Sequence, residues 1–121
     1  MYVQKFRKLT VWQRSIKFVT DIYQLTTKFP KEERFGLVDQ IKRAAVSIAL
    51  NIAEGSGAGS DAEFVRFLRM AQRSAYEVLA ALEIATNLKM ASSDSLQDCI
   101  LEVDQLSAMI SGLIKKLKAD S

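Results

Sequence analysis

Cationic side chains at helical spacing are the residues of this sequence best suited to chemistry with a ligand. Five of them are candidates for binding nucleic acid: Lys42, Arg43, Arg66, Arg69 and Arg73. The last three stand at positions i, i+3 and i+7, which puts them on one face of a helix. Cations in such a row can contact successive phosphates of a nucleic acid. The alternative is a solvated face whose cations pair with Glu63, Glu77 or Asp39 and bind nothing further.

Most familiar hydrolases are excluded by residue types that the sequence lacks. It contains no histidine and a single cysteine, Cys99. Histidine is the usual general base and metal ligand, and Ser–His and Cys–His nucleophile pairs require it. A single cysteine also forms no intramolecular disulfide. We therefore predict a protein that is not an enzyme, with no catalytic residues, no cofactor and no metal site, and with Cys99 as a small buried or half-buried residue.

A glycine-rich stretch at residues 55–60 follows the second helical segment. It matches neither the phosphate-binding loop of nucleotide hydrolases nor the dinucleotide fingerprint. Glycines after a helix usually end it in a tight turn, and we interpret this stretch as such a turn. The alternative is an anion bound by the free amides of the helix that follows. Asn51 and Glu54 either cap the loop or face a neighbouring subunit, and together with Gly55 and Gly57 they form the candidate site at this loop.

Four segments with an apolar repeat of three and four residues must position these side chains. We expect helices over about residues 11–28, 34–54, 60–90 and 93–118. No segment of the sequence shows the sustained period-two alternation of a half-buried strand. Connections of about two to eight residues join antiparallel neighbours in helix bundles. The sequence therefore predicts a single all-α domain, an up-down-up-down antiparallel four-helix bundle.

Inward-facing seams are clear in the second and third segments. The second carries Val38, Ile41, Ala45, Ile48 and Ile52, and the third carries Phe64, Leu68, Ala71, Ala75, Val78, Leu82 and Ala85. Aromatic residues at helical spacing are assigned to the core rather than to base stacking: Trp12, Tyr23, Phe64 and Tyr76. Thr10 with Gln13, and Ser60 with Glu63, have the spacing of a capping box at a helix start, and Ser92 and Ser93 predict an N-cap for the last helix.

The first helical segment has two apolar stripes where a simple bundle needs one. The first stripe is Trp12, Ile16, Val19 and Tyr23, and the second is Val11, Phe18, Ile22, Leu25 and Phe29. Five further apolar residues lie outside all the seams: Phe6, Leu9, Phe35, Leu37 and Leu50. Surplus apolar surface is typical of a protein that assembles. We therefore expect a homo-oligomer.

Composition and charge bound the class of protein. The 121 residues are 49% hydrophobic and 26% charged, as in one globular domain. Residues 1–59 carry ten Lys and Arg against five Asp and Glu, whereas residues 60–121 carry seven against nine. A basic half and a pI near 9.1 fit a nucleic-acid or acidic partner. The sequence has neither a membrane-spanning apolar run nor a secretory signal pattern, so we expect a cytoplasmic protein without a membrane partner.

Four stretches of the chain resemble one known family. They are residues 6–13 (FRKLTVWQ), 35–48 (FGLVDQIKRAAVSI), 51–55 (NIAEG) and 63–69 (EFVRFLR). In this order they resemble the four-helix bundle proteins encoded by intervening sequences of bacterial 23S ribosomal RNA genes. The resemblance implies a cytoplasmic bacterial bundle that assembles as a ring-like homopentamer. A related branch, the accessory variability determinants of diversity-generating retroelements, binds nucleic acid and a reverse transcriptase.

Two functions from different classes follow. The first is an accessory protein that binds RNA or DNA, with RNA favoured, through phosphate contacts of the five cations. The second is a protein-interaction scaffold that docks a reverse transcriptase or another protein and binds no nucleic acid. The chain is only mildly basic, and it has Ala58 and Gly59 where many members of the family carry a basic residue. Both departures weaken the inference of nucleic-acid binding, which we still predict ahead of the scaffold.

Overall fold

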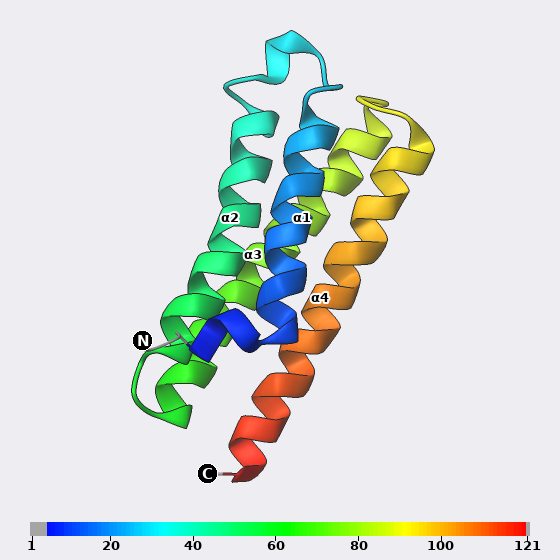
Figure 1. Ribbon diagram of the computed structural model, residues 1–121. Helices are drawn as coiled ribbons and strands as arrows, with labels where there is room; N and C mark the ends of the chain where they lie inside the picture. The colour runs from blue at the N-terminus through cyan, green and yellow to red at the C-terminus, as the bar shows by residue number, and fades with distance from the viewer. Residues whose placement is uncertain (1–4, 121) are drawn as a thin grey trace.

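The computed structural model describes residues 5–120, and this part of the chain forms four long helices and no strand (Figure 1). The helices are α1 (Thr10–Thr26), α2 (Leu37–Ser56), α3 (Asp61–Asn87) and α4 (Ser93–Asp120). Two short 3-10 turns, η1 (Lys5–Lys8) and η2 (Lys31–Glu33), precede α1 and α2. Successive helices run in opposite directions, with the connecting loops at alternate ends of the bundle. The predicted all-α four-helix bundle is confirmed.

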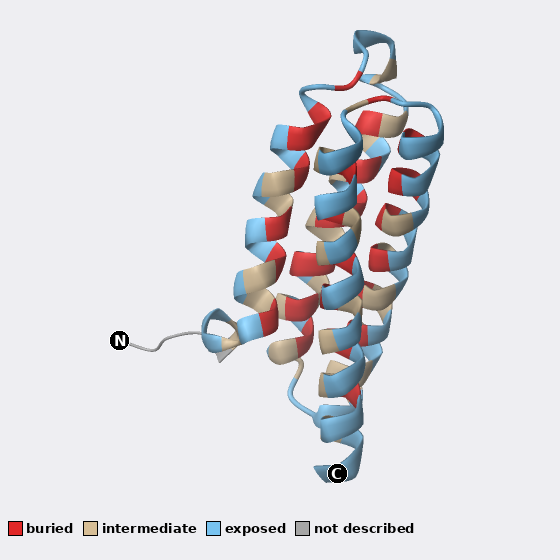
Figure 2. Ribbon diagram, turned by 90° about the vertical axis from the view of Figure 1, so that its right-hand side faces the viewer, coloured by how far each residue is buried: buried red, intermediate tan, exposed pale blue. Residues whose placement is uncertain are grey.

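Each helix packs against two neighbours. The packed pairs are α1–α2, α2–α3, α3–α4 and α1–α4, whereas the diagonal pairs do not approach closely within residues 5–120. Figure 2 shows the buried residues turned toward the space that the four helices enclose. None of the described helices is long and apolar enough to cross a membrane.

The apolar repeat predicts the core of α2 and α3 well. All five seam residues of α2 are buried, and so are the six seam residues of α3 from Leu68 to Ala85. Phe64, at the first position of the α3 seam, is only half-buried because it lies at the end of the bundle. Burial of this apolar surface is the main force that holds the helices together.

The two apolar stripes of α1 have different environments. The second stripe, which includes Phe18 and Ile22, is buried, whereas Ile16 and Tyr23 of the first stripe are each 44% exposed. The expectation that Tyr23 and Tyr76 pack in the core is therefore wrong, since Tyr76 is also exposed. A bundle with two neighbours per helix buries one stripe of α1 fully and the other only in part, since Trp12 and Val19 pack against the edge of the core.

Helix caps follow the local sequence at two of three predicted starts. The Ser60 Oγ accepts a hydrogen bond from the Glu63 amide at 3.1 Å, and the Ser92 Oγ accepts one from the Ser95 amide at 3.2 Å. The predicted capping box at Thr10 is wrong. Leu9 is the N-cap of α1 without a side-chain bond, and the side-chain Nε2 of Gln13 donates to the Arg7 carbonyl at 3.1 Å instead.

The helix ends differ from the predicted bounds by up to three residues, for local reasons. The α3 helix ends at Asn87 rather than 90, because Lys89 adopts a left-handed φ of 55°. Its amide donates to the Thr86 carbonyl, and the Met90 amide donates to the Ala85 carbonyl, which is the Schellman pattern of a helix C-terminus. The α2 helix begins only at Leu37, because residues 31–33 form the turn η2.

Candidate nucleic-acid interface

The three arginines of α3 lie together on the outward side of the bundle. Arg66, Arg69 and Arg73 are all exposed, and we name this set the arginine face. The Arg66 Nη2 lies 3.0 Å from the Glu63 Oε2, and its guanidinium also lies 4.7 Å from the centre of the Phe67 ring. Among residues 5–120, neither Arg69 nor Arg73 has a hydrogen-bond or ion-pair partner. Two of the three charges are therefore available to an outside anion.

The Glu63–Arg66 ion pair partly neutralises the positive charge at one end of the arginine face. The hydrogen bond and the positive charge of Arg66 lower the pKa of Glu63, and the same contact raises the pKa of Arg66. Both groups are ionised at neutral pH, and their pair is exposed to solvent. Exposed ion pairs of this kind are weak, so a phosphate can compete with Glu63 for Arg66.

The two cations of α2 line one surface cavity but interact with different neighbours. The Lys42 Nζ lies 4.6 Å from the centre of the Tyr23 ring, on the side of α2 that faces α1. Arg43 instead pairs with Asp39 at 3.3 Å, and it lines a surface cavity together with Glu77 of α3. The structure therefore does not gather the five predicted cations into one strip, because Lys42 faces α1 and Arg43 has two carboxylates nearby.

Asn51 belongs to a polar contact between α2 and α3. Its Nδ2 donates to the Ser47 carbonyl at 2.9 Å and to the Ser47 Oγ at 3.1 Å, and the Ser74 Oγ donates to the Ser47 Oγ at 2.9 Å. Glu54 is exposed one turn further along α2. Sequence reasoning places Ser47 and Asn51 on one face of this helix but misses Ser74, whose signal is only its place beside the α3 seam. This network joins α2 to α3.

Gly55 is a helix-packing residue rather than a loop residue. It lies inside α2, and a Cβ built on it would be 2.6 Å from the Phe67 Cβ and 2.9 Å from the Phe64 Cδ1. The turn itself begins at Gly57, the C-cap of α2, whose amide donates to the Glu54 carbonyl. Gly59 has a φ of 92°, which favours glycine. The interpretation of this region as a tight turn applies from Gly57 onward.

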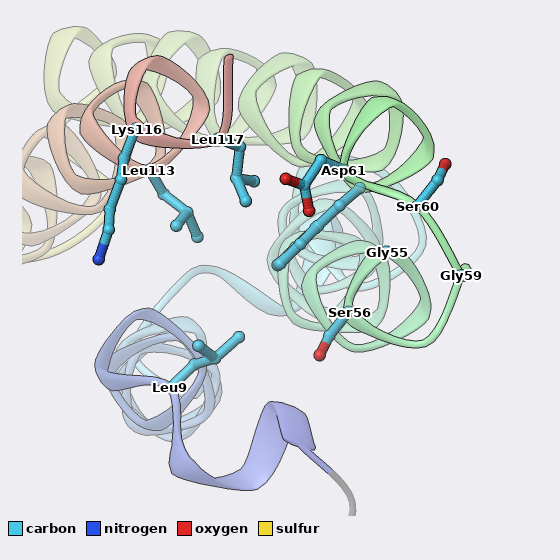
Figure 3. A pocket seen from close by; sticks show the side chains of 10 residues that line it. Leu9, Gly55, Ser56, Gly59, Ser60, Asp61, Leu113, Lys116 and Leu117 are labelled. Atoms are coloured by element: carbon cyan, nitrogen blue, oxygen red, sulfur yellow. The ribbon is translucent and has the colours of Figure 1, made fainter. Parts of the chain in front are cut away.

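A cavity of about 490 Å³ lies at the end of the bundle where α2 meets α3. Leu9 points into it from one side, and Leu113 and Leu117 point into it from the other (Figure 3). Its polar lining includes Asp61 and Lys116, one charge of each sign. Within the described residues, no three acidic or cysteine side chains are grouped so that they could hold a metal ion.

Apolar side chains form an exposed surface across α1 and α2. The α1–α2 face comprises Ile16, Val19 and Tyr23 of α1 with Val46 and Leu50 of α2; Ile16, Tyr23 and Leu50 are exposed, and the two valines are half-buried. Leu50 is 51% exposed, and it lines one surface cavity together with Tyr23 and Val46. Because the α1–α2 face and the arginine face are on different helices, both can be occupied at once.

Cys99 is buried between α4 and α1, as predicted, and its thiol should react slowly. Burial raises the pKa of the thiol to about 11, and the charges of Asp21 and Asp98 add to the effect.

Because the ordinary pKa of the thiol is 9.0, native protein at pH 8 should hold about 100-fold less Cys99 thiolate than unfolded protein. Labelling by iodoacetamide with and without urea tests this, and equal rates would contradict it. The same shift lowers stability as the pH rises from 9 to 11, since only the unfolded thiol ionises there.

Comparison with known proteins places the chain among relatives of undefined activity. The family model described as 23S rRNA-intervening sequence protein matches residues 7–112. The fold is similar to that of a protein of unknown function from the S23 ribosomal protein family of Bacteroides thetaiotaomicron. That similarity has a TM-score of 0.82 and 25% sequence identity, over 88% of this chain and 99% of the other. No curated protein matches the chain.

Proposed function

The chain belongs to the family of 23S rRNA-intervening sequence proteins, and we propose that it is a cytoplasmic, non-enzymatic accessory protein that binds RNA. The observation that carries the proposal is the arginine face, where two of three exposed guanidinium groups have no partner within residues 5–120. Arginine presents a planar fork of donors that matches phosphate geometry. The contacts are to phosphates, so binding depends on charge and carries little sequence preference.

Assembly of several copies strengthens this binding. We place the contact between copies on the α1–α2 face, whose exposed apolar side chains gain from being covered. The arginine face lies on α3, which does not pack against α1, and it stays accessible in such an assembly. Several arginine faces acting on one RNA raise the overall affinity well above that of one copy. The pentamer implied by the family resemblance is one assembly of this kind.

A protein-interaction scaffold is the second candidate, and the same α1–α2 face favours it. The face is apolar at its centre, and its cavity has Asp39, Arg43 and Glu54 in its lining, the arrangement common in protein interfaces. A reverse transcriptase or another protein can be held there in place of a second copy. A scaffold of this kind is expected not to bind RNA in a salt-dependent way, so a measurement of RNA affinity at two salt concentrations distinguishes the scaffold from the RNA-binding protein.

Removing the arginine face should abolish most RNA binding. In a fluorescence-anisotropy titration with a structured RNA, the triple variant Arg66→Ala, Arg69→Ala, Arg73→Ala should bind at least about tenfold more weakly at 50 mM salt. The slope of log affinity against log salt should become shallower by about three, because each arginine that binds a phosphate adds roughly one to it. The measurement is repeated at 200 mM salt and with a DNA duplex.

The control removes the same number of charges from other sides of the molecule. The control variant carries the three changes Lys17→Ala, Lys28→Ala and Lys89→Ala. All three lysines are exposed: Lys17 is in α1, Lys28 follows α1, and Lys89 follows α3. The control variant should keep the salt slope of the unmodified protein. Equal losses in the two triple variants would show that net charge alone governs binding, and the arginine face would then have no special role. Absence of binding by the unmodified protein at 50 mM salt would favour the scaffold.

A further inference from the structure

Phe35 lies at the end of the bundle that holds the α1–α2 connection, and it is 86% exposed. It lies between η2 and the N-cap of α2. The Arg34 guanidinium carbon lies 5.1 Å from the centre of the Phe35 ring. An aromatic ring this exposed adds little to the core, and its face is open to contact with a ligand.

The cavity beside Phe35 has the charge of a site for an anion. It has a volume of about 520 Å³, within the usual range of small-ligand sites. Its lining is Thr26, Thr27, Phe29, Pro30, Lys31, Arg34, Phe35, Val38 and Lys42. Three of these residues are cationic and none is acidic. The cavities beside Cys99 and beside Asn51 both carry carboxylates, which would repel a phosphate.

We propose that Phe35 and the cations around it bind one unpaired nucleotide of RNA, with the base stacked on the Phe35 ring and the phosphate held by Lys31 and Lys42. Phe29 and Val38 supply an apolar wall, and the Arg34 guanidinium lies close to the ring, where it adds a cation to the stack. Stacking on an aromatic ring is the common way for proteins to hold single-stranded RNA, and it tolerates any base. This inference rests on the proposed function and narrows its substrate to RNA with unpaired segments.

The position of Phe35 fits a path from the arginine face. Phe35 also lines the cavity that contains Gln40 and Arg43 of α2 and Glu77 of α3. Glu77 lies one helical turn beyond Arg73, the last member of the arginine face. An RNA strand on the arginine face can reach Phe35 along the α2–α3 side, where Arg43 is the cation that offsets the carboxylates of Asp39 and Glu77 in this cavity. The paired part of a structured RNA lies on the arginine face, and its unpaired end reaches the ring.

The test compares unpaired and paired RNA with variants at Phe35. Phe35→Leu keeps an apolar side chain but removes the ring, and it should lower the affinity for an unstructured RNA of about ten nucleotides by about tenfold. The affinity for a duplex of the same length should not change. Phe35→Tyr keeps the ring and should bind both RNAs normally. A 2-aminopurine base in the unstructured RNA should be quenched by the unmodified protein and by Phe35→Tyr, but not by Phe35→Leu.

Leu101→Ala, at an exposed leucine of α4, is the control for a smaller apolar surface, and it should bind both RNAs normally. The inference would be overturned if the Phe35→Leu protein bound the unstructured RNA as tightly as the unmodified protein does. If the unmodified protein also bound the duplex in that case, the proposed function would still stand. Equal losses for both RNAs would also overturn it, because the ring would then not select unpaired bases. If the unmodified protein binds neither RNA, the proposed function itself fails.

Discussion

A Gly55→Val protein is expected to lose about 3 kcal/mol of stability, with a melting temperature lower by about 10 °C. The reason is the distance of 2.6 Å between a Cβ at this position and the Phe67 Cβ. The Phe64 ring, 2.9 Å away, can turn into the neighbouring cavity, but the Phe67 Cβ is fixed to its backbone. The helices α2 and α3 must therefore separate at this end, and the buried seam between them opens to water. Thermal unfolding followed by circular dichroism measures the change.

Gly112 provides the matched control for the glycine itself. It lies inside α4, is exposed, and has nothing within 4 Å of a Cβ built on it. Gly112→Ala should therefore stabilise the protein by about 0.5–1 kcal/mol, since alanine favours the helix more than glycine does. A Gly55→Val protein as stable as the unmodified one would mean that α2 and α3 are not packed as closely as the structure shows.

Leu50→Glu is expected to convert the proposed assembly into monomers of 13.5 kDa. Leu50 is in the α1–α2 face, and covering a carboxylate in an apolar contact costs more than the leucine gains there, although Lys42 and Arg43 line the same cavity. The residue is 51% exposed in the single chain, so the helices themselves should remain folded. Light scattering coupled to gel filtration measures the mass, and circular dichroism checks the fold. RNA affinity should fall as well, by about a hundredfold, because the copies no longer act on one RNA together.

Leu101→Glu is the control for adding a surface charge. Leu101 is 58% exposed on α4, close to the value for Leu50, but it lies outside the α1–α2 face. This variant should keep the mass of the unmodified protein. If both variants dissociate the assembly, the contact between copies includes α4. An unmodified protein that is monomeric at every concentration tested would end the proposal of assembly and leave the arginine face to act alone.

The fold was largely predictable because its signal is local and repeated. The seams of α2 and α3 recur every three or four residues, and a stripe of this period has no stable place except against other helices. The boundaries were less predictable, since they depend on single residues. The α3 helix stops where Lys89 takes a left-handed conformation, and nothing in the side chain of a lysine announces this.

The candidate site was predictable only in part. The arginine face follows from helical spacing alone, because residues at i, i+3 and i+7 of one helix share a side whatever surrounds them. Lys42 and Arg43 are adjacent in sequence and so point to different sides of α2, one toward Tyr23 and one toward Asp39. Which neighbour each side chain meets depends on how α2 is rotated in the bundle. The contact between Arg14 of α1 and Glu102 of α4, at 2.7 Å, was likewise beyond sequence reasoning.

The sequence by itself determined four amphipathic helices, their antiparallel order and the row of arginines on α3. These properties are set by residues close together in the chain, whose geometry is fixed once a helix forms. Only the tertiary structure decided which stripe of α1 is buried and that Gly55 serves close packing rather than a turn. It also decided that Phe35 lies exposed beside cations of α2 and η2. Each of these depends on which surfaces of different helices meet, and that is settled by packing of the whole bundle.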